Sequence, residues 1–316
     1  MLTNLEIQLK EQASKSKKHK NIMYALTVAL FITPALLFYL IFIIYPICQS
    51  FIYSFFKVEV FGVLTKYQYV GLANFKAVFF DLVFWQAARN TLTWALTSPF
   101  LEIPLGLLLA LYLQRGTKTT KFMRVLWFTP VLLPQIVVGI LWAWVYNSDW
   151  GLLNNILKTL GLHQFALAWL GSPQTALPAL IVVTTWMWTG FNMIILLAAV
   201  SSVPKELLEA ATLDGAKGYH VLFGIIVPLI RPVLVNLLML CFIGKMKVFD
   251  LIWATTQGGP LWGTETVATY TVKRAFYWGT FEKGFPSAMA TIWFLIILVI
   301  SISTTMALQK KEILEY

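Results

Sequence analysis

Six long apolar stretches constrain this chain more than any other feature of its sequence. A helix needs about 20 mostly apolar residues to cross the hydrocarbon core of a bilayer, and six segments meet that need. They lie at about 22–47, 90–113, 125–146, 177–201, 225–250 and 287–308. The sequence therefore predicts an all-α membrane protein with six transmembrane helices. We expect a single membrane domain over 21–316 after a hydrophilic tail at 1–20.

The composition agrees with a membrane protein. Hydrophobic residues make up 59% of the chain and charged residues 12%, whereas soluble domains carry roughly 25% charged residues. The formal net charge of +10 does not indicate a nucleic-acid partner, because the basic residues lie between the apolar stretches rather than along one face. The 2 cysteines form no CxxC pair and the 3 histidines are scattered, so the sequence predicts neither a disulfide framework nor a metal site.

Prolines fall inside most of the predicted spans. They are Pro34, Pro46, Pro99, Pro104, Pro130, Pro134, Pro178, Pro228 and Pro232. In water they would argue against helices. In a membrane bundle, neighbouring helices and ordered waters satisfy the backbone groups that proline frees, so they do not exclude the spans.

The distribution of basic residues predicts the orientation. The tail holds five lysines, and the short connection between the second and third stretches holds Arg115, Lys118, Lys121 and Arg124, whereas the long connection after the third holds only Lys158. Since cytoplasmic loops are enriched in lysine and arginine, we expect both termini in the cytoplasm. The tail itself either sets this topology or binds anionic lipid.

A short charged segment, PKELLEAATLDGAKG at 204–218, separates the fourth and fifth stretches. Pro204 suits the first turn of a helix, and Gly215 suits the left-handed position after a helix end. Such a helix would be about 16 Å long, about half of a span. Leu207, Leu208 and Ala211 would share one side. This pattern fits either a helix that inserts into a partner's groove or an interfacial amphipathic helix.

The segment resembles the EAA loop of binding-protein-dependent ABC importer permeases. Three residues separate Glu209-Ala210-Ala211 from Gly215, and nine residues separate Gly215 from Ile225. After one further residue comes Val227-Pro228, with Val227 where leucine is usual. VGLANFKAVFFDLVFWQAARNT, WFTPVLLPQIVVGILWAWVY and TTQGGPLWGTETVATYTVKRAF also resemble segments of the MalF/UgpA-like sugar permeases of that group. The resemblance covers roughly residues 25–308.

The resemblance implies a type I ABC importer permease fold, with a cytoplasmic coupling helix at about 204–215 that docks on an ATPase. Glu209, Ala210, Ala211 and Gly215 match the motif, and Glu206, Leu208 and Asp214 are assigned to the same coupling helix. The implied partners are a second homologous permease, two ATPase subunits that bind ATP and Mg, an extracytoplasmic solute-binding protein and membrane lipid. The implied location is the inner membrane of a bacterial cell. Loops 57–89, 147–176 and 251–286 would meet the binding protein.

The chain carries no ATPase motif of its own. A phosphate-binding loop needs G-x-x-x-x-G-K-[ST], and the Gly244-Lys245 pair is followed by Met246 and lacks the earlier glycine. The sequence also has no nucleophile–base pair and no paired carboxylates at one depth, which a catalytic site would require. We therefore expect a non-catalytic subunit that has no cofactor of its own.

Polar residues inside the fourth and fifth stretches are candidates for the solute pathway, because polar groups in spans are commonly functional. They are Thr184, Trp188, Asn192, Asn236 and Lys245. A tryptophan can cover a sugar ring while threonine or asparagine bonds its hydroxyls, or the tryptophans pack against neighbouring helices or lipid.

The charge of Lys245 allows more than one role. It could recognise an acidic sugar. Alternatively, Lys245 and Lys247 extend to the outer interface or pair with Asp250.

Glu102 lies between two prolines of the second stretch. It either pairs with Arg231 or Lys245, lies beside a proline kink with water, or relays protons. The predicted function is the permease subunit of an ATP-driven, binding-protein-dependent importer of sugars or oligosaccharides, including acidic ones. The alternative is an ion-coupled secondary transporter of a small polar solute.

Overall fold

The computed structural model describes residues 23–24, 26–61, 64–278 and 282–312; the predicted tail at 1–20 lies outside them. The chain divides into two units, Met1–Tyr53 and Ser54–Tyr316. In the first unit an apolar helix runs over Leu26–Tyr53. It contains a π-helical turn, η1 (Leu40–Ile44), followed by α2 (Tyr45–Tyr53). Pro46 in α2 has no N–H to donate, and the wide turn just before it accommodates the interrupted hydrogen-bond ladder.

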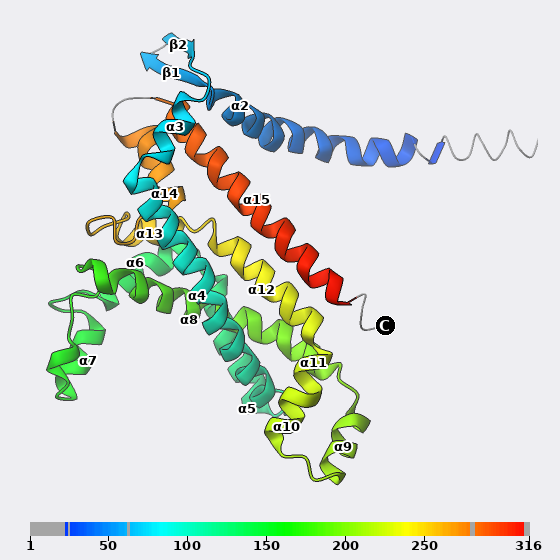
Figure 1. Ribbon diagram of the computed structural model, residues 1–316. Helices are drawn as coiled ribbons and strands as arrows, with labels where there is room; N and C mark the ends of the chain where they lie inside the picture. Colours follow the sequence, from blue (N-terminus) through cyan, green and yellow to red (C-terminus); the bar gives the residue numbers. More distant parts are fainter. Residues whose placement is uncertain (1–22, 25, 62–63, 279–281, 313–316) are drawn as a thin grey trace, which may run out of the picture. The chain divides into compact units, whose positions relative to one another are not determined.

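The second unit is a helical bundle with a small β-hairpin (Figure 1). Its elements, in chain order, are β1 (Phe56–Phe61), β2 (Leu64–Tyr69), α3 (Ala73–Phe79), α4 (Leu82–Leu113), α5 (Lys118–Phe128), η2 (Thr129–Leu132), α6 (Gln135–Val145), α7 (Leu152–Thr159), η3 (His163–Phe165), α8 (Pro173–Ser201), α9 (Lys205–Leu213), α10 (Gly218–Val221), η4 (Leu222–Ile226), α11 (Val227–Leu229), α12 (Arg231–Lys245), α13 (Asp250–Thr255), α14 (Val267–Val272), η5 (Lys273–Tyr277) and α15 (Gly284–Glu312).

Four helices in the described residues are long and apolar enough to cross a membrane. They are Leu26–Tyr53, α4, α8 and the Gly284–Thr304 part of α15. Two further candidates are bent pairs: Lys118–Leu132 with Gln135–Val145 at 100°, and Gly218–Leu229 with Arg231–Lys245 at 72°. Counting each pair as one span gives six. The predicted helical membrane fold is confirmed, with the correction that the third and fifth stretches are broken helices.

Both breaks occur next to prolines. Leu133, which precedes Pro134, has ψ 139°, the extended conformation that a following proline favours. In the fifth stretch, Ile230 leaves the helix with ψ 5° and Pro232 lies in the first turn of α12, where its missing N–H costs nothing. The prolines Pro99, Pro104 and Pro178, by contrast, lie inside continuous helices.

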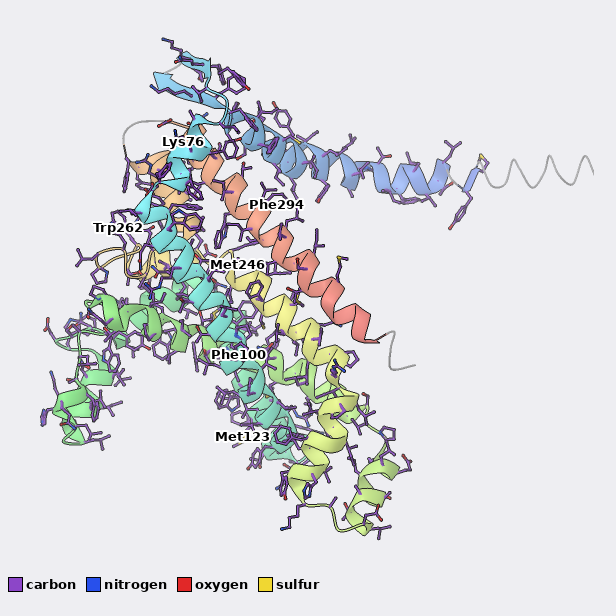
Figure 2. All side chains as sticks on the ribbon, viewed as in Figure 1. Lys76, Phe100, Met123, Met246, Trp262 and Phe294 are labelled. Atoms are coloured by element: carbon purple, nitrogen blue, oxygen red, sulfur yellow. The ribbon has the colours of Figure 1, made fainter. Side chains whose placement is uncertain are left out.

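The long helices α4 and α8 pack against each other and form the centre of the bundle. Gly106 permits this contact, because a Cβ there would lie 3.0 Å from the Cβ of Asn192. Buried apolar side chains gather in three clusters that join these helices to α6, α12, α14 and α15. Other apolar side chains stay exposed, such as Phe100 on α4 and Phe294 on α15 (Figure 2). An apolar exterior of this kind suits contact with lipid.

The β-hairpin is an addition to the predicted all-α fold. Its strands pair antiparallel, with Phe56 opposite Tyr69. It is tied to the start of α15, since Lys283 N donates to Val58 O over 3.0 Å. A Cβ on Gly284 would overlap the carbonyl of Phe56, so only glycine allows this close contact.

The segment between α13 and η5 is folded around a buried carboxylate, Glu265. Thr269 Oγ1 donates to its Oε1 over 2.7 Å, and Lys273 pairs with its Oε2. Gly258 has φ 85°, and a Cβ there would overlap the same carboxylate. Asn90 of α4 donates to the carbonyls of Trp262 and Glu265, each over 2.9 Å. These bonds fix the segment on the end of α4.

Candidate functional site

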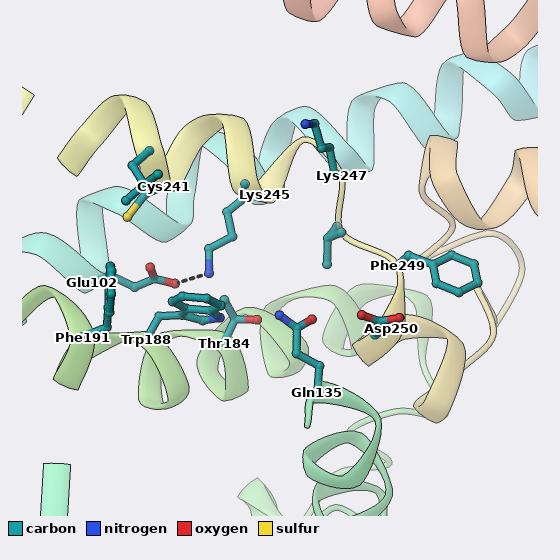
Figure 3. Close-up of a pocket in the computed structure, with 13 residues that line it drawn as sticks. Glu102, Gln135, Thr184, Trp188, Phe191, Cys241, Lys245, Lys247, Phe249 and Asp250 are labelled. Carbon is teal, nitrogen blue, oxygen red and sulfur yellow. Dashed lines mark ion pairs between the residues drawn. The ribbon is translucent and has the colours of Figure 1, made fainter. Parts of the chain in front are cut away.

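A pocket of about 370 Å³ lies between α4, α6, α8, α12 and α13 (Figure 3). We call it the Trp188 pocket. Its lining residues are Glu102, Gln135, Thr184, Trp188, Phe191, Leu240, Cys241, Gly244, Lys245, Lys247, Val248, Phe249 and Asp250. Its volume lies in the range of small-molecule sites, about 300–1,000 Å³.

The ends and breaks of the helices place the polar lining residues. Lys245 is the last residue of α12, and Trp293 Nε1 fixes that end by donating to Met246 O over 3.0 Å. Gln135 is the first residue of α6, directly after the break at Pro134. Glu102 reaches the pocket from the part of α4 that packs on α8.

The strongest interaction in the pocket is a buried ion pair. Lys245 Nζ lies 2.8 Å from Glu102 Oε1, and the two side chains are 9% and 0% exposed. Lys245 Nζ also lies 5.0 Å from the centre of the Trp188 ring, within the range of a cation–π contact. The side chains of Cys241 and Asn192 also contact the Glu102 carboxylate. Of the two partners predicted for Glu102, the structure therefore selects Lys245.

This contact excludes two of the roles predicted for Lys245. Its side chain neither extends to an interface nor pairs with Asp250, because it is buried and bound to Glu102. Lys247 is exposed, and Figure 3 shows its amine turned away from Lys245 and Glu102. The physical reason is burial: a lysine that ends inside a bundle needs a counter-charge there.

The structure brings three of the five predicted pathway residues together: Thr184, Trp188 and Lys245 line the pocket. Asn192 is fully buried behind it, where its Oδ1 accepts a hydrogen bond from Cys241 Sγ over 3.6 Å. Asn236 lies exposed on α12 and is not part of the lining.

Sequence reasoning did not include Gln135 among the pathway residues, although it lines the pocket. The available signal was a polar side chain directly after Pro134 inside an otherwise apolar stretch. Phe249 and Asp250 were missed as pathway residues as well, because they enter the pocket only through the turn between α12 and α13.

The predicted coupling segment forms the short helix α9. Pro204 precedes its first turn as the N-cap, and Gly215 has φ 76°, as its left-handed role requires. Two leucines are exposed, Leu207 by 46% and Leu213 by 89%. Leu208, instead, packs against a buried cluster of the bundle.

The other predicted coupling residues lie on or just after α9. Glu206, Glu209, Ala210 and Asp214 are exposed, and Ala211 is half-buried. They form a surface that no other part of the described chain covers.

The geometry can now be set beside known proteins. Residues 102–311 match the family described as "binding-protein-dependent transport system inner membrane component". The chain belongs to this family. The protein is therefore a permease of a binding-protein-dependent ABC importer, a non-catalytic, multi-pass inner-membrane subunit. The predicted membership of this family is confirmed, and the alternative of an ion-coupled secondary transporter is set aside.

Relatives of this permease match most of its length. It is 34% identical over 275 residues to the probable ABC transporter permease protein YurN of Bacillus subtilis, covering 86% of this chain and 92% of the relative. It is 33% identical over 273 residues to the trehalose/maltose transport system permease protein MalF of Thermococcus litoralis, covering 86% and 90%.

A solved structure has the same fold. The permease matches a chain from the crystal structure of a bacterial alginate ABC transporter in complex with an alginate pentasaccharide-bound periplasmic protein. The TM-score is 0.78 at 23% identity, over 90% of this chain and 94% of that chain. This likeness shows that the two chains share a fold.

Proposed function

We propose that this permease carries a sugar or short oligosaccharide through the Trp188 pocket. The observation that carries the proposal is the combination of an aromatic face with hydrogen-bonding groups: Trp188 lies beside Thr184 and Gln135 in one pocket (Figure 3). A flat ring covers the C–H side of a sugar, and hydroxyl and amide groups bond its hydroxyls. The trehalose/maltose permease among the relatives supports the same substrate class.

The energy for transport comes from a separate subunit through α9. This helix is too short to span, and its exposed Leu207 and Leu213 are suited to a groove on a partner. Glu206 and Glu209 are also exposed on α9. We assign the partner as one of two ATPase subunits, which bind ATP and Mg.

The full importer also contains a second, homologous permease and an extracytoplasmic solute-binding protein. A second permease is needed because one six-span subunit would line only part of a pathway. The basic connections place both termini in the cytoplasm, so loops 57–89, 147–176 and 251–286 face the binding protein.

Within this class, the charges of the pocket favour a neutral sugar. Glu102 and Asp250 offset Lys245 and Lys247, so the lining carries two groups of each sign. The second candidate is an acidic sugar, because the solved chain with the same fold belongs to an alginate transporter. It would bring a second negative charge close to Glu102, whose carboxylate already neutralises Lys245.

Uptake into proteoliposomes tests the proposal. The permease is reconstituted with its partner permease, ATPase and binding protein, and labelled trehalose is supplied outside. We expect uptake that needs ATP in the compartment of the ATPase and persists when ionophores collapse all ion gradients. Uptake without ATP would contradict the ATP-driven mechanism. Uptake that stops when the ion gradients are collapsed, with ATP still present, would contradict it as well. Failure to transport any neutral or acidic sugar would contradict the substrate class.

A further inference from the structure

The buried pair of Glu102 and Lys245 has a role beyond holding α4 and α12 together. We propose that Glu102 determines the charge selectivity of the Trp188 pocket: it neutralises Lys245, so the pocket accepts neutral sugars and disfavours anionic ones. This proposal rests on the proposed function, and it adds a specificity-determining residue to it.

The position of Lys245 gives it direct access to a solute in the pocket. Its amine lies over the ring of Trp188, 5.0 Å from the ring centre, and both residues line the pocket. The amine has three N–H donors, and the Oε1 of Glu102 at 2.8 Å accounts for one of them. Without Glu102, the amine would be a positive charge on the wall of the binding site.

No other described cation in the lining can replace it. Lys247 lines the pocket but is exposed, and its amine is turned away from the pair (Figure 3). Solvent screens an exposed charge, whereas a charge in a buried site interacts strongly with its neighbours. The selectivity for charge therefore depends on Lys245 and on its partner.

The polar groups around Glu102 form a closed cluster. Cys241 and Asn192 contact the Glu102 carboxylate, and Cys241 Sγ donates to Asn192 Oδ1 over 3.6 Å. Because the side chain of Glu102 is 0% exposed, it acts on a solute through its charge rather than through a direct hydrogen bond. An anionic sugar would meet this negative charge beside Lys245, whereas a neutral sugar would not be repelled by it.

Replacing Glu102 by glutamine tests the proposal, because it removes the charge and keeps the shape. Binding of methyl α-glucoside and of its anionic counterpart methyl α-glucuronide is measured by equilibrium dialysis on the assembled importer in nanodiscs, without the binding protein. We expect the wild type to prefer the glucoside. In E102Q the ratio of the two dissociation constants should move toward the glucuronide by about tenfold or more, because a charge-assisted hydrogen bond becomes available.

Two further variants control for misfolding and for general charge effects. The double variant E102Q/K245M removes both charges and should return to the preference of the wild type. The matched control K158M changes an exposed cation on α7, outside the pocket lining, and should move the ratio by less than about threefold.

The outcomes separate the two proposals. A wild type that binds the glucoside, with an unchanged ratio in E102Q, would overturn the role of Glu102 and leave the proposed function standing. A wild type that binds neither probe would overturn the proposed function and this inference with it. A shift in K158M as large as that in E102Q would also overturn the role of Glu102.

Discussion

The ion pair between Glu102 and Lys245 predicts a strong, non-additive effect on stability. Replacing Lys245 by methionine leaves a carboxylate that is 0% exposed without a counter-charge. Two unit charges at the observed 2.8 Å interact by about 6 kcal/mol at an effective dielectric constant of about 20. Desolvation offsets part of this, and removing one partner of a buried pair typically costs about 3–5 kcal/mol.

The assay is thermal unfolding of the purified importer in detergent, followed by intrinsic fluorescence and by the monodisperse fraction in gel filtration. For a chain of this size we expect K245M and E102Q each to lower the Tm by about 5–10 °C. The double variant E102Q/K245M should recover most of that loss, since apolar or neutral replacements of a buried pair are often nearly neutral.

The double-mutant cycle gives the coupling energy directly. Two single variants whose effects simply add, with a coupling below about 1 kcal/mol, would refute the reasoning. That result would mean that solvent reaches the pair and screens it.

Three further predictions concern other parts of the fold. A Cβ on Gly190 would overlap the carbonyl of Trp127, so Gly190→Ala should cost about 1–3 kcal/mol, measured as a lower Tm; an unchanged Tm would be inconsistent with that contact. The Tyr270 hydroxyl donates to Asp81 Oδ2 over 2.7 Å, and burial together with this bond raises the pKa of Tyr270 above its usual value. Because the folded state holds this proton more tightly, the stability that the hydroxyl adds should be full at neutral pH and should fall above about pH 10. The Tm difference between the wild type and Tyr270→Phe should therefore shrink above that pH. A difference that grows would contradict the assignment. Leu207→Asp on α9 should leave the Tm unchanged, because Leu207 is exposed, but lower ATP-driven uptake at least about tenfold; uptake equal to that of the wild type would exclude α9 as the coupling helix.

The apolar stretches predicted the long helices well because a span is a local property of the sequence. Twenty apolar residues form a helix in lipid whatever surrounds them, and α4 and α8 follow the predicted stretches. The broken spans could not be predicted in the same way. Pro99 and Pro134 are equally visible in the sequence, yet only Pro134 ends a helix, at a point where α6 turns to pack on α13.

The candidate site depended on packing between distant segments. The sequence predicts that Glu102 and Lys245 lie inside spans, and it predicts two possible partners for Glu102, of which Lys245 is one. Only the register of α4 against α12 decides the pairing. Asn236 lies on the same helix as Lys245 but is exposed outside the pocket, because a polar residue in a span does not by itself indicate which face of the helix it occupies.

Sugar uptake by a Trp188→Ala variant of the reconstituted importer decides whether the solute passes through the Trp188 pocket. We predict a loss of at least about tenfold at subsaturating sugar, since the ring forms the stacking face of the pocket. Trp144→Ala is the matched control, because Trp144 is 62% exposed on α6 and does not line the pocket; its uptake should stay within about twofold of the wild type. Equal uptake by both variants would contradict the claim that the solute passes through this pocket.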